Sequence, residues 1–324
     1  MKKAARVGPA SLAEGVREGD ARAIARAISL IEDNDPEAAR LIGELFPHTG
    51  RALLVGLTGS PGTGKSSLVN HLARHYRAQG KKVGIIAIDP TSPFTGGALL
   101  GDRVRMQEHA TDENIYIRSM ATRGSLGGLA RATGDAVLVL DAAGKDLILI
   151  ETVGVGQDEI DIVRLADVTV LLLVPGLGDD VQTFKAGVME IADVFVINKV
   201  DRGEGERVER ELKAMLSLSR RQDGWQTPVV KTVATEGTGV EELAEAVERF
   251  NAYLDQNDLR EQKRTERWQE RLLDLIRQRA LERVLEVAVG KESLARYAGQ
   301  IARRERDPHS VVEELLRTAG VNRG

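Results

Sequence analysis

The octapeptide Gly59-Ser60-Pro61-Gly62-Thr63-Gly64-Lys65-Ser66 matches G-x-x-x-x-G-K-[ST], the pattern of a phosphate-binding P-loop. An apolar run at residues 53–57 precedes it, and Leu68, Leu72 and Tyr76 follow at helical spacing. The segment therefore predicts a strand, a loop and a helix in succession. In that context the loop's backbone N–H groups can surround phosphate oxygens at the helix N-terminus. A glycine-rich turn that binds nothing is the alternative, and the complete pattern disfavours it.

Within this loop we expect two side chains to carry distinct chemistry. Lys65 would reach the β- and γ-phosphates of a nucleoside triphosphate, and the Ser66 hydroxyl would ligate Mg²⁺. The other nucleotide contacts expected from the loop are Gly59, Pro61, Gly62, Thr63, Gly64 and Ser67.

Composition narrows the class of protein. The 324 residues carry a net charge of −4, which argues against bulk electrostatic binding to nucleic acid or to an anionic membrane. With no cysteine there is no disulfide, thiolate metal site or thiol nucleophile, which suits a reducing compartment, and we expect a cytoplasmic location. The basic N-terminus lacks the apolar region of a secretory signal, and no apolar run approaches the length of a membrane span.

The order of the expected elements indicates an α/β fold with a mainly parallel, doubly wound sheet of the P-loop NTPase type. We assign residues 1–50 to an N-terminal helical extension, with helices over 11–31 and 36–46, and residues 51–256 to the P-loop domain. The strands expected after the P-loop are 83–88, 136–140, 147–150, 168–174, 194–197 and 228–232.

Residues 257–324 form the third expected part, a helical tail. Residues 259–289 combine dense Arg and Glu with an apolar face, and a last helix is expected over 311–318. The apolar face indicates either a partner or dimer surface or a tail that folds back on its own core, and the pattern leaves both open.

The tetrapeptide Asn198-Lys199-Val200-Asp201 follows an expected strand and predicts guanine recognition. The Asp201 carboxylate can accept hydrogen bonds from N1–H and the 2-amino group of guanine, a donor pair that adenine lacks. We expect Asn198 and Lys199 to contact the nucleotide as well. Thr235 begins a loop after the last strand that could close over the base.

Acidic residues mark the triphosphate side of the expected site. Glu151 ends an apolar strand and would hold Mg²⁺ directly or through water, while the Gly154 N–H would contact the γ-phosphate within a switch loop at 154–157. Asp89 and Asp102 are further candidate metal or water ligands. Val155 stands where Ras-like GTPases carry glutamine, so we expect slow intrinsic turnover.

With these motifs assembled, the chain resembles the MeaB/ArgK family of P-loop GTPases. These are methylmalonyl-CoA mutase accessory proteins, and they include the methylmalonic aciduria type A protein. The resemblance extends over nearly the whole chain. The segments that carry it are 88–98, 101–106, 118–124, 151–157 and 175–182.

The resemblance implies a GTPase that binds GTP, GDP and Mg²⁺ and forms a homodimer through its C-terminal arm. It implies that Asp89, Asp102 and Glu151 belong to the Mg²⁺ and hydrolysis site. It also implies a further switch at 175–186, whose Lys185 could stabilise transition-state charge when a partner moves it to the nucleotide. The implied role is GTP-gated loading and protection of the adenosylcobalamin site of an acyl-CoA mutase, with that mutase as partner.

Three other functions share a P-loop. A nickel-delivery GTPase metallochaperone would use Cys and His, and the chain has no Cys and five His. A P-loop kinase of a transport protein would need neither the guanine motif nor the loop after Glu151. A partition ATPase carries an additional lysine near the start of the P-loop, where this chain has Ser60.

Overall fold

The structure is a computed structural model and describes residues 9–89, 112–121, 128–152, 165–175, 192–218, 221, 223–288 and 290–320. The chain divides into two compact units, Met1–Arg260 and Glu261–Gly324. No helix among these residues combines the length and apolar character needed to cross a lipid bilayer.

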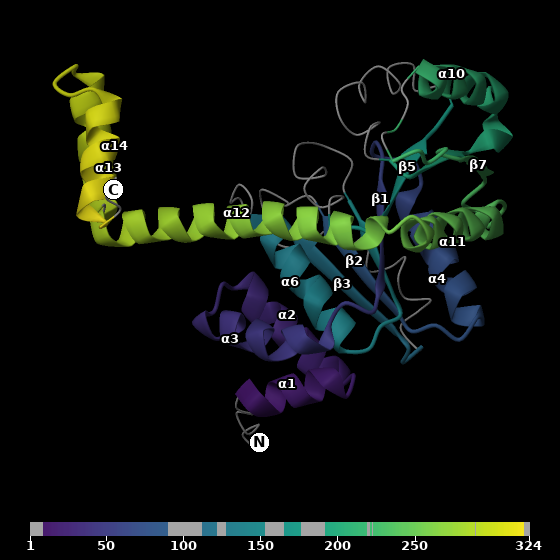
Figure 1. The fold of residues 1–324 in the computed structure, drawn as a ribbon, viewed down its shortest axis with the longest axis horizontal. Helices are drawn as coiled ribbons and strands as arrows, with labels where there is room; N and C mark the ends of the chain where they lie inside the picture. The colour runs from purple at the N-terminus through teal and green to yellow at the C-terminus, as the bar shows by residue number, and fades with distance from the viewer. Residues whose placement is uncertain are drawn as a thin grey trace. The chain divides into compact units, whose positions relative to one another are not determined.

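The first unit is built on a parallel β-sheet with the strand order β3-β2-β4-β1-β5-β6-β7 (Figure 1). Parallel strands need crossover connections, and here helices supply several of them. The expected α/β fold with a doubly wound parallel sheet is thereby confirmed. The strands are β1 Leu53–Thr58, β2 Val83–Asp89, β3 Ile115–Ala121, β4 Leu147–Glu151, β5 Val168–Leu173, β6 Val194–Asn198 and β7 Val229–Thr232.

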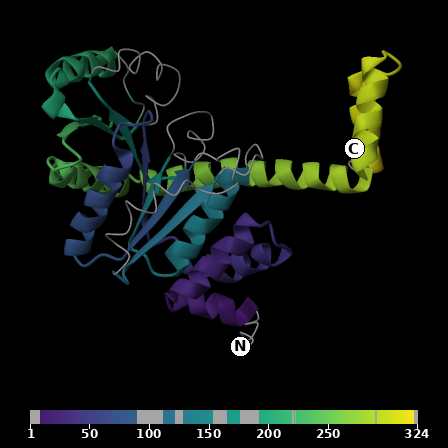
Figure 2. The same ribbon diagram turned by 180° about the vertical axis from the view of Figure 1, so that it is seen from behind.

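Helices cover both faces of the sheet. Successive strand residues point to opposite faces, so each buried strand contributes apolar side chains to both layers. Ile85 and Leu149 pack beneath α4 (Lys65–Ala78) and α11 (Val240–Gln256). Their neighbours Ile86 and Ile148 pack on the other face with α6 (Gly128–Ala142) and the N-terminal helices. Figure 2 shows the two layers from behind. A third cluster buries Leu212 of α10 (Gly205–Leu218) against β5 and β6.

The N-terminal extension consists of α1 (Pro9–Arg17), α2 (Ala21–Glu32), α3 (Pro36–Leu45) and the short η1 (Phe46–His48). The prediction of one helix over 11–31 is wrong. Gly19 has φ +78°, and the Asp20 side chain accepts a hydrogen bond from the Ala23 backbone N–H, which starts a new helix. Helix α3 begins at Pro36, where the sequence predicts it to begin, and Asp35 is its N-cap.

Two further differences concern the sheet. Residues 136–140 are not a strand but part of α6, where Ala136, Val139 and Leu140 are fully buried. An apolar run of this length fits a buried helix as well as a buried strand. Strand β3 was not predicted. It is an edge strand, paired only with β2 in the described sheet, and its residues are largely half-buried, so its apolar signal is weaker.

The second unit has a small core of its own. Its helices are α12 (Leu259–Ala288, which begins in the first unit), α13 (Gly290–Ala302) and α14 (Pro308–Thr318). Tyr297, Val311 and Leu315 are buried together, and the Tyr297 hydroxyl donates to the Glu314 carboxylate at 2.9 Å. The expected last helix is confirmed, with Asp307 as its N-cap.

Candidate nucleotide-binding site

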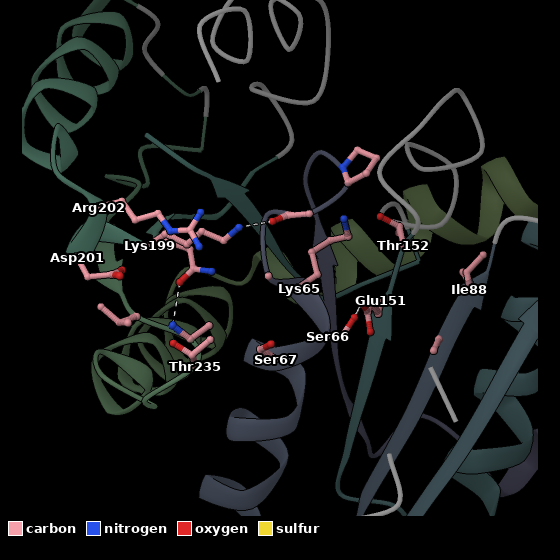
Figure 3. Close-up of a pocket in the computed structure, with 17 residues that line it drawn as sticks. Lys65, Ser66, Ser67, Ile88, Glu151, Thr152, Lys199, Asp201, Arg202 and Thr235 are labelled. Carbon is pink, nitrogen blue, oxygen red and sulfur yellow. Dashed lines mark hydrogen bonds between the residues drawn. The ribbon is translucent and has the colours of Figure 1, made fainter. Parts of the chain in front are cut away.

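A cavity of about 430 Å³ lies at the carboxyl edge of the sheet, where ligands bind in open α/β folds (Figure 3). It gathers residues from the P-loop, from the ends of β2, β4 and β6, and from the segment after β7. The sequence-predicted residues that line it are Pro61, Gly62, Gly64, Lys65, Ser66, Ser67, Glu151, Asn198, Lys199, Asp201 and Thr235.

The backbone of the P-loop requires glycine at two close approaches. Gly59 has φ +145°, and a Cβ atom there would collide with the Leu172 carbonyl of β5. Gly64 has φ +96°, is the N-cap of α4, and leaves no room for a Cβ beside the Asn198 amide. Both glycines are therefore required by the backbone conformation of the loop, independently of any contact with a ligand.

Lys65 is buried and held inside the loop. Its Nζ donates to the carbonyl oxygens of Gly59 at 2.6 Å and Ser60 at 3.0 Å. The Thr63 hydroxyl donates to the same Ser60 carbonyl at 2.8 Å, which braces the turn. The ammonium group is thus positioned at the start of α4, where backbone N–H groups and the helix dipole favour an anion.

Ser66 and Glu151 meet across the loop, and the Ser66 hydroxyl donates to Glu151 Oε1 at 2.5 Å. Glu151 is the last residue of β4 and is 8% exposed. Next to it, the Thr152 hydroxyl hydrogen-bonds the Thr58 hydroxyl at 3.1 Å. A hydroxyl and a carboxylate oxygen that converge on a cavity are the hard oxygen donors that Mg²⁺ prefers, so the residues present fit that ion.

The guanine motif is tied to the P-loop by hydrogen bonds. Asn198 Nδ2 donates to the Thr63 carbonyl at 2.6 Å, and Asn198 Oδ1 accepts from the Thr232 hydroxyl and the Ala234 N–H, both at 2.9 Å. Asn198 therefore holds the P-loop, β6 and the segment after β7 together.

Lys199 and Asp201 follow Asn198 into the cavity wall. Lys199 has φ +60°, and its Nζ donates to the Gly62 carbonyl at 2.6 Å. Asp201 lies in η3 (Val200–Arg202), is exposed, and lines the cavity near Thr235 (Figure 3). An acceptor-only carboxylate at this edge can receive the two donors of guanine.

Some predicted residues fall outside the described part of the chain. Asp102, Gly154 and Lys185 are among them, and for Asp89 only the backbone at the end of β2 is described. Gly59 and Thr63 belong to the loop but not to the cavity lining. Lining residues that sequence reasoning missed are Ala87, Ile88, Thr152, Arg202, Val233 and Ala234. Position could have identified most of them, since they adjoin predicted site residues.

A P-loop, a guanine motif joined to it and a shared cavity at the sheet edge define a P-loop GTPase. Comparison with known proteins identifies the family within this class. Residues 24–288 match the family described as methylmalonyl Co-A mutase-associated GTPase MeaB. The chain belongs to this family, binds GTP and GDP, and is a GTPase. The resemblance stated from the sequence is thereby confirmed.

Individual relatives agree with this assignment. A protein of Pyrococcus abyssi described as a GTPase is 48% identical over 309 residues, covering 94% of this chain and 95% of that protein. GTPase ArgK of Escherichia coli is 35% identical over 305 residues, or 91% of each chain. A crystal structure described as LAO/AO transport system kinase is 26% identical, with a TM-score of 0.73 over 97% of this chain and 98% of its own.

Proposed function

We propose that this GTPase gates the loading and protection of the adenosylcobalamin site of an acyl-CoA mutase of the methylmalonyl-CoA type. The observation that carries the proposal is the family match over residues 24–288, whose description names association with that mutase. The site supports it, because its P-loop and guanine motif fit GTP, and a protein that binds GTP and GDP in different conformations can couple hydrolysis to a partner.

In this proposal different described residues bind different parts of the nucleotide. Lys65 binds the β- and γ-phosphates, and Asp201 binds the guanine edge. Ser66 and Glu151, whose side chains meet at 2.5 Å, hold Mg²⁺. When bound, Mg²⁺ would supply positive charge that offsets the negative charge developing on the phosphates during hydrolysis. Asp89, Asp102, Gly154 and Lys185 complete the proposed hydrolysis site.

We also propose that the functional form is a homodimer. Helix α12 is 30 residues long and carries apolar side chains that stay exposed: Leu272 at 56%, Leu273 at 52% and Ile276 at 54%. Ile276 lies four positions after Leu272 and three after Leu273, so all three side chains fall on one side of the helix. A second copy of the same helix would bury such a stripe in a self-complementary way.

The test is steady-state hydrolysis of GTP and of ATP, with and without a purified acyl-CoA mutase from the same organism. We expect slow hydrolysis of GTP alone, a several-fold acceleration by the mutase, and loss of both in Lys65→Ala. The control is Lys263→Ala on α12, distant in sequence from the P-loop, which should hydrolyse GTP as the wild type does. Equal use of ATP would contradict the guanine site, and indifference to the mutase would contradict the partner.

A second candidate follows from the solved structure described as a transport system kinase. A kinase would transfer the γ-phosphate to a protein hydroxyl instead of to water. Radiolabelled GTP and ATP distinguish the two functions in the same assay, because a kinase leaves label on an acceptor protein whereas a GTPase releases it as phosphate.

A further inference from the structure

Arg202 lines the nucleotide cavity although its residue type is not part of the guanine motif. It is the last residue of η3 and directly follows Asp201. Figure 3 places Arg202 at the side of the cavity that carries Asp201 and Thr235, whereas Ser66 and Glu151 lie on the other side of Lys65. Its place in the cavity therefore points to the nucleoside end of a bound nucleotide.

The backbone around Arg202 is tightly constrained. Lys199 and Gly203 bracket the turn with φ values of +60° and +86°. Within it, the Arg202 N–H donates to the Lys199 carbonyl at 3.1 Å, and the Gly203 N–H donates to the Val200 carbonyl at 3.3 Å. The backbone position from which the Arg202 side chain extends is thus fixed, so a ligand would not need to order the backbone of this turn.

The guanidinium group has no competing partner in the part of the chain that the structure describes: no hydrogen bond or ion pair joins the Arg202 side chain to another of these residues. Arg207 of α10 differs, because its Nε donates to the Glu211 carboxylate at 2.9 Å. Nor does Lys199 offer its charge to the base, since its ammonium is bound to the Gly62 carbonyl. Among the described residues of this wall, Arg202 therefore has a guanidinium available to a nucleoside.

We propose that Arg202 is a nucleotide-binding residue whose planar guanidinium packs on the guanine base and ribose. A guanidinium is flat and weakly hydrated, so it stacks on aromatic faces where an ammonium group cannot. Asp201 binds the edge of the base, so the two flat faces of the base can pack against neighbouring side chains. The contact serves GTP and GDP equally, because both carry the same nucleoside. This inference rests on the proposed binding of guanine by Asp201.

Calorimetric titration with GDP and with a non-hydrolysable GTP analogue tests the proposal. In Arg202→Gln we expect Kd to rise about 3- to 10-fold for both nucleotides by the same factor. Arg202→Lys should recover only part of the loss, since it keeps the charge and removes the plane. Arg207→Gln is the matched control and should bind as the wild type does. The kcat at saturating GTP should not change in Arg207→Gln.

Each other outcome rejects a defined part of the idea. A wild-type Kd in Arg202→Gln, with unchanged thermal unfolding, overturns the contact. A loss confined to the GTP analogue moves Arg202 to the phosphates, and full recovery by Arg202→Lys removes the stacking. Asp201→Asn, titrated in parallel, separates the two proposals: if guanine selectivity survives that change, the proposed position of the base is wrong. If selectivity is lost but Arg202→Gln is silent, only the role of Arg202 fails.

Discussion

At the scale of single residues, Asp201 is where the choice of base can be tested. Its carboxylate offers only acceptors, whereas the amide of asparagine offers a donor and an acceptor. Asp201→Asn should therefore weaken GTP binding about 100-fold, the cost of losing charge-assisted hydrogen bonds, and should favour xanthosine triphosphate, whose 2-oxo group accepts from the amide. Competition binding with the two nucleotides measures the exchange.

The control for this exchange is Asp258→Asn, an exposed aspartate at φ +55° where asparagine is tolerated and which does not line the cavity. It should bind GTP as the wild type does. Unchanged GTP affinity in Asp201→Asn would show that another group reads the base.

At the scale of elements, Asp141 joins α6 to the segment that enters β1. Its carboxylate is buried and accepts from the N–H groups of Gly50 at 2.5 Å, Arg51 at 3.2 Å and Ala52 at 3.1 Å. Removing the Asp141 carboxylate takes this acceptor away from all three backbone N–H groups. Asp141→Ala should therefore lower the free energy of unfolding by about 2–3 kcal/mol, measured by urea denaturation at constant GDP.

Asp146→Ala is the comparison for this change. Asp146 also accepts a backbone hydrogen bond, from the Lys82 N–H at 2.7 Å, but it is exposed, so water can replace the lost partner. We expect a loss of under about 1 kcal/mol there. Equal losses for the two variants would mean that the burial of Asp141 does not determine its contribution.

At the scale of the whole molecule, the exposed stripe on α12 predicts the oligomeric state. Charges placed on it should prevent a second copy from packing there, so Leu273→Glu with Ile276→Glu should convert a dimer to a monomer in sedimentation analysis. Gln278→Lys adds charge to the opposite side of the same helix, beside the Glu282 carboxylate, and should leave the dimer intact. A wild-type chain that sediments as a monomer would reject the proposal.

Local sequence was sufficient for the features that depend on neighbours in the chain. The P-loop, the guanine motif and Glu151 each combine an apolar strand with a few polar residues directly after it, and this pattern predicted both the parallel fold and the edge where the cavity lies. The family could also be named from the sequence, because several long segments carry the resemblance.

Tertiary structure alone decided features that depend on packing between distant residues. Residues 136–140 form part of a helix and not a strand. A short apolar run is compatible with either element, and its packing against the rest of the fold determines which one forms. The Asn198 side chain donates a hydrogen bond to the Thr63 carbonyl, 135 positions away, and no local sequence pattern predicts a contact at that separation. Arg202 likewise follows the guanine motif as an ordinary charged residue, and only the turn at Lys199 brings it into the cavity wall.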